Sequence, residues 1–177
     1  MKFLENLLIF MLNSKIVKHN QIQGYSESEV LEYENARNIR FPHYYREYLL
    51  FMGKNQGELF QRANVRLEYI DERTQGFLSQ VNQYGFKVTK RLLENGFLFY
   101  DNQGTIFNFF YFDSFEDNPE IFTVDDEGIE VSANMQFTDF LWDEARKIAE
   151  IIDSYLKGIQ ADELPLSTNH CTTNPNN

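Results

Sequence analysis

Between residues 97 and 131, helical periodicity gives way to short aromatic and β-branched runs that are separated by turn residues. Four of these runs are predicted as strands: Phe97–Tyr100, Thr105–Phe112, Ile121–Val124 and Ile129–Val131. Asp, Asn, Glu, Gln and Gly fill the turns at 101–104 and 125–128, and connections this short favour antiparallel pairing. The segment therefore predicts an antiparallel β-meander of about four short strands.

The regions on both sides of this meander carry helical periodicity. Apolar residues recur every three or four positions in five segments, which we predict as helices: residues 2–13, 26–38, 42–52, 73–84 and 135–156. A short turn of helix also fits residues 89–94. We therefore assign the chain to the α+β class, with the meander packed against N-terminal helices and a long C-terminal helix.

Individual residues mark the ends of these helices. Ser26 and Glu29 have the spacing of a capping box, in which each side chain accepts a hydrogen bond from the other residue's N–H. Gly158 is the expected end of the last helix. We therefore predict a single domain over residues 1–157 and a disordered polar tail over residues 158–177.

The aromatic runs of the meander are continuous and do not alternate with polar residues. Phe97–Tyr100 and Phe109–Phe112 contain only Phe, Tyr and Leu. Because successive side chains of a strand point to opposite faces, some rings must face away from the helices unless both faces of the sheet are covered. Exposed rings would favour binding to another protein. The sequence leaves open whether residues 58–95, its least regular part, form an inserted recognition element.

The net charge of −11 is unevenly distributed along the chain. Residues 1–93 contain 10 acids and 13 bases, whereas residues 94–163 contain 17 acids and 3 bases. No Lys or Arg occurs between Leu92 and Ala145. Such a half repels nucleic acid and anionic lipid, so neither is expected as a partner. It attracts a basic protein, although an acidic face can also serve solubility alone.

The apolar N-terminus lacks the features of a secretory or membrane segment. Phe3–Leu12 is far shorter than the ~20 residues that span a bilayer, and Glu5 interrupts it. Residues 13–15 offer no small-x-small cleavage site. Cys171 is the single cysteine, so no internal disulfide can form, which fits a reducing compartment. We expect an amphipathic first helix and a cytoplasmic protein.

The residue types that usually carry catalysis are not arranged for it. His19, His43 and His170 fit no metal-ligand spacing, and Cys171 has no cysteine partner. The sequence also lacks a Gly-rich phosphate loop and a Gly-x-Ser-x-Gly motif. The acidic clusters do not follow the calcium-loop pattern. We therefore expect no enzyme, no cofactor and no bound metal.

Residues 36–57 carry a pattern known from a protein superfamily. An acidic helix runs into Ile39-Arg40-Phe41-Pro42, and Tyr45, Tyr48-Leu49 and a glycine-containing break follow. This resembles the "leucine-proline, then Tyr, then Phe-Leu, then Asn-Gly-Gly" signature of the SUKH superfamily. Phe41 takes the place of the usual aliphatic residue, and Gly53-Lys54-Asn55-Gln56-Gly57 takes that of Asn-Gly-Gly.

The second half of the chain agrees with this resemblance. Members of the superfamily continue with an antiparallel sheet and a closing helix that begins in a Ser/Phe-rich stretch, and residues 132–141 resemble that stretch. The similarity covers residues 27–57 and 96–145, whereas residues 58–95 do not align. It implies an α+β domain without catalytic residues. In bacteria it implies a cytoplasmic immunity protein that neutralises a toxin, often a nuclease.

Nuclease domains are basic, so the charge pattern agrees with this implication. We expect the toxin to contact the acidic turns, with two tyrosines as aromatic anchors. The expected contact residues are Tyr100, Tyr111, Asp113, Glu116, Asp117, Glu120, Asp125, Asp126 and Glu127.

Three other functions compete with this one. A regulatory adaptor of the same fold would bind a host protein and would need no basic partner. A small metal-dependent hydrolase would use the acidic turns, and would then contain a stoichiometric metal and carboxylates with shifted pKa values. A structural or phage-derived protein would oligomerise through the aromatic sheet, and a weak homodimer is a related expectation.

Overall fold

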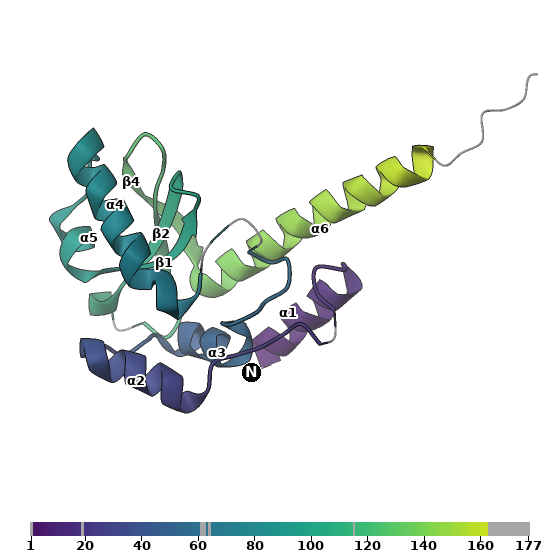
Figure 1. Ribbon diagram of the computed structural model, residues 1–177, viewed down its shortest axis with the longest axis horizontal. Coiled ribbons are helices and arrows are strands. Elements are labelled where there is room, and N and C mark those ends of the chain that lie inside the picture. The colour runs from purple at the N-terminus through teal and green to yellow at the C-terminus, as the bar shows by residue number, and fades with distance from the viewer. Residues whose placement is uncertain (1, 19, 61–62, 64, 115, 163–177) are drawn as a thin grey trace, which may run out of the picture.

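A computed structural model of the chain describes residues 2–18, 20–60, 63, 65–114 and 116–162. Its helices are α1 (Lys2–Asn13), α2 (Glu27–Arg37), α3 (His43–Met52), α4 (Ile70–Tyr84), α5 (Lys90–Asn95) and α6 (Phe137–Asp162), with short 3₁₀ helices η1 (Leu67–Tyr69) and η2 (Phe112–Ser114). The strands are β1 (Gly96–Asn102), β2 (Ile106–Tyr111), β3 (Glu120–Val124) and β4 (Glu130–Gln136). The predicted α+β class is confirmed (Figure 1).

The four strands form one antiparallel sheet in the order β1-β2-β3-β4. Each strand pairs with its neighbours along the chain, so the predicted meander is confirmed. Three residues connect the paired Asn102 and Ile106, and two of them, Gln103 and Gly104, turn the chain with positive φ values of 53° and 75°. The Thr105 N–H donates to the Asn102 carbonyl across this turn at 3.1 Å.

The start of the last helix differs from the prediction. We expected this helix to begin near Met135, but β4 continues to Gln136 and α6 begins at Phe137. The pairing of β4 with β3 shifts register next to Glu120, and Asn134 has a left-handed φ of 52°. This irregularity places extra residues in β4 and so delays the start of the helix.

One face of the sheet packs against α3 and the start of α6. Tyr45 of α3 is fully buried, and its ring lies 5.2 Å from Phe110 of the sheet and 5.3 Å from Phe137 of α6, measured between ring centroids. The same cluster continues to Leu7 and Met11 of α1. It therefore draws buried side chains from both ends of the domain, and it is the main core.

Residues between 77 and 92 cover the other face of the sheet, whereas Leu59, Phe60 and Leu67 belong to the main core. Phe77 of α4 lies 5.0 Å from Phe107 and 4.8 Å from Phe109, measured between ring centroids. Leu92 of α5 and Leu98 of β1 complete this second cluster. The sheet lies between α4 and α5 on one side and α3 and α6 on the other (Figure 1). The continuous aromatic runs are thus explained by a sheet that is covered on both faces.

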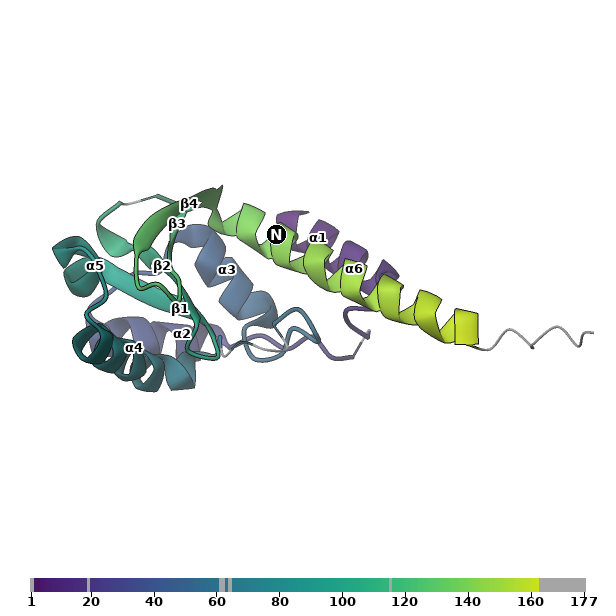
Figure 2. The same cartoon turned by 90° about the horizontal axis from the view of Figure 1, so that it is seen from above.

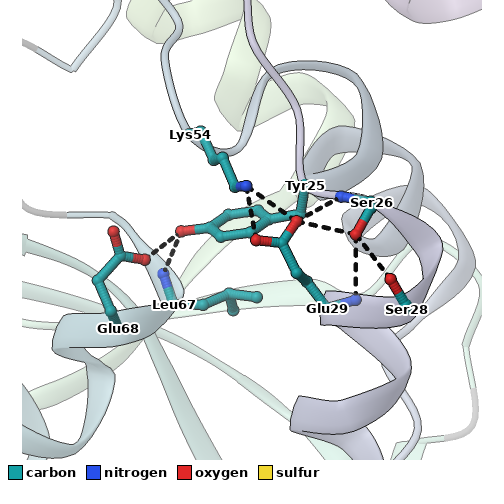
Figure 3. Close-up of polar contacts among 7 residues, drawn as sticks. All are labelled: Tyr25, Ser26, Ser28, Glu29, Lys54, Leu67 and Glu68. Atoms are coloured by element: carbon teal, nitrogen blue, oxygen red, sulfur yellow. Dashed lines mark hydrogen bonds and ion pairs between the residues drawn. The ribbon is translucent and has the colours of Figure 1, made fainter.

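A polar network ties the start of α2 to the segments that follow α3 (Figure 3). The predicted capping box is confirmed, because Ser26 and Glu29 exchange hydrogen bonds between side chain and backbone. The Glu29 carboxylate also accepts from Lys54 Nζ at 2.6 Å. The Tyr25 hydroxyl donates to Glu68 and accepts from the Leu67 N–H at 3.1 Å. The network joins the helices of the first face to the segment that leads into α4.

The last helix continues further than predicted. We expected it to end at Gly158 and to be followed by a disordered tail, but α6 continues to Asp162. Gly158 does not adopt the left-handed φ of a helix cap, and a helix can continue through one glycine at a cost of about 1 kcal/mol. The predicted tail from 163 to 177 lies outside the described residues. In both views α6 extends beyond the sheet, with α1 beside its first half (Figures 1 and 2).

The predicted amphipathic first helix is present as α1, with Leu4, Leu7 and Met11 buried and Ile9 exposed. Within the described part of the chain, no helix combines the length and the hydrophobicity needed to cross a bilayer.

Candidate functional site

A cleft of about 540 Å³ lies between two connections that are far apart in the sequence. One wall is the α2–α3 connection, and the other is the connection between β2 and β3. The lining residues are Asn38, Ile39, Arg40, Phe41, Pro42, His43, Tyr111, Phe112, Ser114, Glu116 and Asp117. The Tyr44 N–H donates to the Asp117 carbonyl at 3.0 Å and holds the two walls together. We call this space the connector cleft.

The wall from the α2–α3 connection is held by a buried carboxylate. Asn38 ends α2 in a left-handed conformation with a φ of 52°, and the chain then turns toward the sheet. Glu34 is buried, and its carboxylate accepts from the Phe41 N–H at 2.8 Å and lies 3.7 Å from Arg46 Nε. Phe41 packs 5.2 Å from Phe97, measured between ring centroids. The residues of the SUKH-like pattern therefore form a rigid wall of this cleft.

The wall from the β2–β3 connection carries four of the predicted acidic residues in or beside the cleft. Glu116 and Asp117 are exposed and line it, and within the described residues neither has an ion-pair partner. Glu120 is exposed and accepts a hydrogen bond from the Ser132 hydroxyl. Asp113 forms a two-point ion pair with Arg91 of α5. The hydrogen bond from Arg91 lowers the pKa of Asp113, so this carboxylate stays ionised. The positive charge of Arg91 already balances its negative charge.

The structure corrects the expectation that two tyrosines act as exposed anchors. Tyr100 and Tyr111 are only 8% and 3% exposed. Burial raises the pKa of each hydroxyl to about 12, and for Tyr111 the hydrogen bond to Glu130 also contributes. Arg91 lies over the Tyr111 ring at 4.0 Å. Tyr100 belongs to the main core and Tyr111 to the cluster on the other face, so little of either ring is left for a partner. The sequence could not show this because the covering segments lie far away in the chain.

The remaining predicted acidic residues lie at the opposite end of β3. The Asp125 carboxylate accepts from the Glu127 and Ile129 N–H groups at 3.1 and 3.3 Å, so it closes the β3–β4 turn. Asp126 and Glu127 are exposed at its tip. Because β3 is a strand of five residues, about 13 Å separate its two ends. The seven predicted carboxylates therefore form two groups, and only the group near residues 113–120 borders the connector cleft.

Sequence reasoning missed three charged residues that shape this site. Glu34 holds one wall, Arg40 lines it, and Arg91 neutralises Asp113 across 22 positions of the chain. The burial of Glu34 could have been inferred from its spacing, because it lies on the same helical face as Val30, which is buried. Among the described residues, no group of three or more His, Cys, Asp or Glu side chains is arranged to hold a metal ion.

The chain matches none of the protein-family models compared with it, and no curated protein is significantly similar to it in sequence.

Proposed function

We propose that this protein is a cytoplasmic immunity protein that binds and neutralises a basic, nuclease-type toxin, as its resemblance to the SUKH superfamily implies. One observation carries the proposal. Six carboxylates at the two ends of β3 have no ion-pair partner within the described residues: Glu116, Asp117, Glu120, Asp125, Asp126 and Glu127. Five of these six are exposed, so they are free to pair with lysines and arginines of another protein.

The connector cleft supports the same proposal. Its lining includes the aromatic residues Phe41 and Phe112 and, from the β2–β3 connection, the acids Glu116 and Asp117. An arginine side chain suits such a place, because its guanidinium can stack on a ring and pair with a carboxylate at once. The second acidic group, at Asp126 and Glu127, adds negative charge at the other end of β3. Two acidic groups about 13 Å apart fit a broad basic groove better than a single point contact.

The test begins by identifying what the protein retains from a lysate of its own source at low and high salt. A basic protein that is released as salt rises is expected, because screening weakens exposed ion pairs. A salt-resistant neutral or acidic partner would favour the regulatory adaptor instead. A stoichiometric metal in the purified protein would favour the metal-dependent hydrolase.

A pair of charge-matched variants then locates the surface. The first variant is Glu116→Lys, Asp117→Lys and Glu120→Lys. The control is Glu5→Lys, Glu32→Lys and Glu72→Lys, three exposed acids on α1, α2 and α4, which changes the net charge by the same amount. The first variant should weaken binding of the retained toxin at least about a hundredfold, and the control should have little effect. Equal losses in both variants would mean that net charge acts without a defined surface.

A further inference from the structure

The second half of α6 presents an apolar stripe to solvent. Ile151 and Tyr155 are 61% and 70% exposed, and they are among the most exposed large apolar side chains of the described residues. Ile148 and Ile152 lie beside them and are half-buried. These four positions fall on one side of the helix because they are spaced three or four residues apart. A helix with this much exposed apolar surface indicates a contact with another molecule.

A groove of about 620 Å³ runs along the same stripe at the base of α6. Ile148, Ile151 and Tyr155 form one side of it, and Leu59, Phe60 and Tyr100 from the body of the domain form the other. In both views α6 extends past the rest of the domain (Figures 1 and 2). The exposed stripe of α6 therefore forms one wall of an apolar groove, and the body of the domain forms the other wall.

The charge of this segment differs from that of its surroundings. All three basic residues between positions 94 and 163 are on α6: Arg146, Lys147 and Lys157. The groove itself is lined by two acids, Glu58 and Glu144, and two bases, Lys15 and Lys147, so its lining has no net charge. Lys147 pairs with Glu144 at 2.9 Å, and Lys157 pairs with Asp153 at 2.6 Å. This surface is thus charge-balanced within an otherwise acidic half.

We propose that this groove is occupied by α6 of a second copy of the chain, in a two-fold symmetric dimer with the two helices antiparallel. In such an interface the same patch serves on both subunits, so the exposed stripe of each copy packs into the groove of the other. Two copies with a net charge of −11 repel each other. The charge-balanced surface of α6 is a place where they can approach closely.

The proposed dimer leaves the toxin-binding surface free. None of the seven predicted acidic residues lines the groove beside α6. The inference therefore does not rest on the proposed function, and each can fail without the other.

Sedimentation of the full chain over micromolar to millimolar concentrations tests the proposal. A reversible monomer–dimer equilibrium is expected, and it should persist in high salt because the contact is apolar and charge-balanced. Ile151→Glu and Tyr155→Glu should each raise the dissociation constant of the dimer at least about tenfold, because each places a charge in the apolar contact. Ile9→Glu on α1 is the matched control, since Ile9 is 56% exposed and does not line the groove.

Because both positions are largely exposed in the monomer, these variants should keep the unfolding midpoint of the wild-type chain at concentrations where it is monomeric. A chain that remains monomeric at the highest concentration would overturn the proposal. A dimer that Ile9→Glu weakens as much as Ile151→Glu, or that neither variant at 151 and 155 weakens, would also overturn it, because the contact would then lie elsewhere.

Discussion

The two faces of the sheet are covered in different ways. The face toward α3 and α6 belongs to a cluster that includes α1, the α2–α3 connection and residues as late as Ala145. The face toward α4 and α5 belongs to a cluster of seven buried residues, of which Phe77 and Leu92 are the helical members. α4 is fifteen residues long, yet Phe77 is its only fully buried side chain in this cluster. The first cover is a core, whereas the second is a thin layer over an aromatic sheet.

The two covers should therefore differ in local stability. Regions with few buried apolar contacts open at a lower free energy than the core does. We expect the amides of α4 and α5 to exchange with solvent before those of α3 and β2. The largest predicted effects follow from removing one central ring on each side.

Tyr45→Ala should be the most destabilising of the changes considered. The Tyr45 ring contacts rings from the α2–α3 connection, β1, β2 and α6, so its loss leaves a cavity at a point where four elements meet. Such truncations of a buried aromatic ring cost about 3–5 kcal/mol. Urea unfolding at neutral pH measures this free energy. A cost below about 1 kcal/mol would show that the first cover can close over the lost ring.

Phe77→Ala should cost less, about 2–3 kcal/mol, because the thin second cover can move inward to fill part of the cavity. The ring contacts Phe107 and Phe109, and otherwise borders the partly buried Leu78 and Val81. In this variant, the backbone amides of α4 should exchange faster with solvent, whereas those of α3 should change less. Equal acceleration in both helices would mean that the two covers unfold as one unit, which contradicts the lower local stability expected for α4 and α5.

Several features of the helices before the sheet, and the meander itself, could be predicted from the sequence. The bounds of α1 and the capping box of α2 were predicted correctly because they depend on local spacing. The meander was predictable because its turns carry residues that favour them. These features depend on neighbours within a few positions of the chain.

The second face and the connector cleft could not be predicted in the same way. The burial of Tyr111 depends on α5, and the wall opposite Glu116 depends on the connection near Phe41. Both are contacts between segments that lie far apart in the chain. In addition, a mostly polar helix such as α4 can either cover a sheet or face solvent, and its sequence alone does not distinguish the two. The mostly polar pattern of residues 77–92 therefore concealed their role as a cover.

Two tyrosine-to-phenylalanine changes compare the faces on a smaller scale. The Tyr111 hydroxyl donates to Glu130 on the second face, so Tyr111→Phe should cost about 1 kcal/mol. The Tyr48 hydroxyl in the first core has no hydrogen-bond partner among the described residues. Tyr48→Phe should therefore be neutral or slightly stabilising, because an unsatisfied buried hydroxyl is removed. Urea unfolding of both variants is the measurement, and a larger loss for Tyr48→Phe would reverse this assignment.

The smallest effect concerns the network that joins the two covers, and it depends on pH. The hydrogen bond from Lys54, with those from Ser26, lowers the pKa of Glu29 from 4.5 to about 2. A carboxyl whose folded pKa is lowered contributes stability above the unfolded value, and this contribution is lost as pH falls from about 4.5 toward about 2. Glu29→Gln removes the charge, so wild type should exceed the variant in stability at neutral pH.

That difference should shrink between these two pH values, because the wild-type carboxylate becomes protonated in the same range. Urea unfolding of both proteins at several pH values measures it. Glu32→Gln is the control, since Glu32 is an exposed acid on the same helix outside the network. If the network couples the covers, Glu29→Gln should also speed exchange at the start of α4, which directly follows η1, where Leu67 and Glu68 hold Tyr25. Faster exchange confined to α2 would show that Glu29 acts only as part of the helix cap.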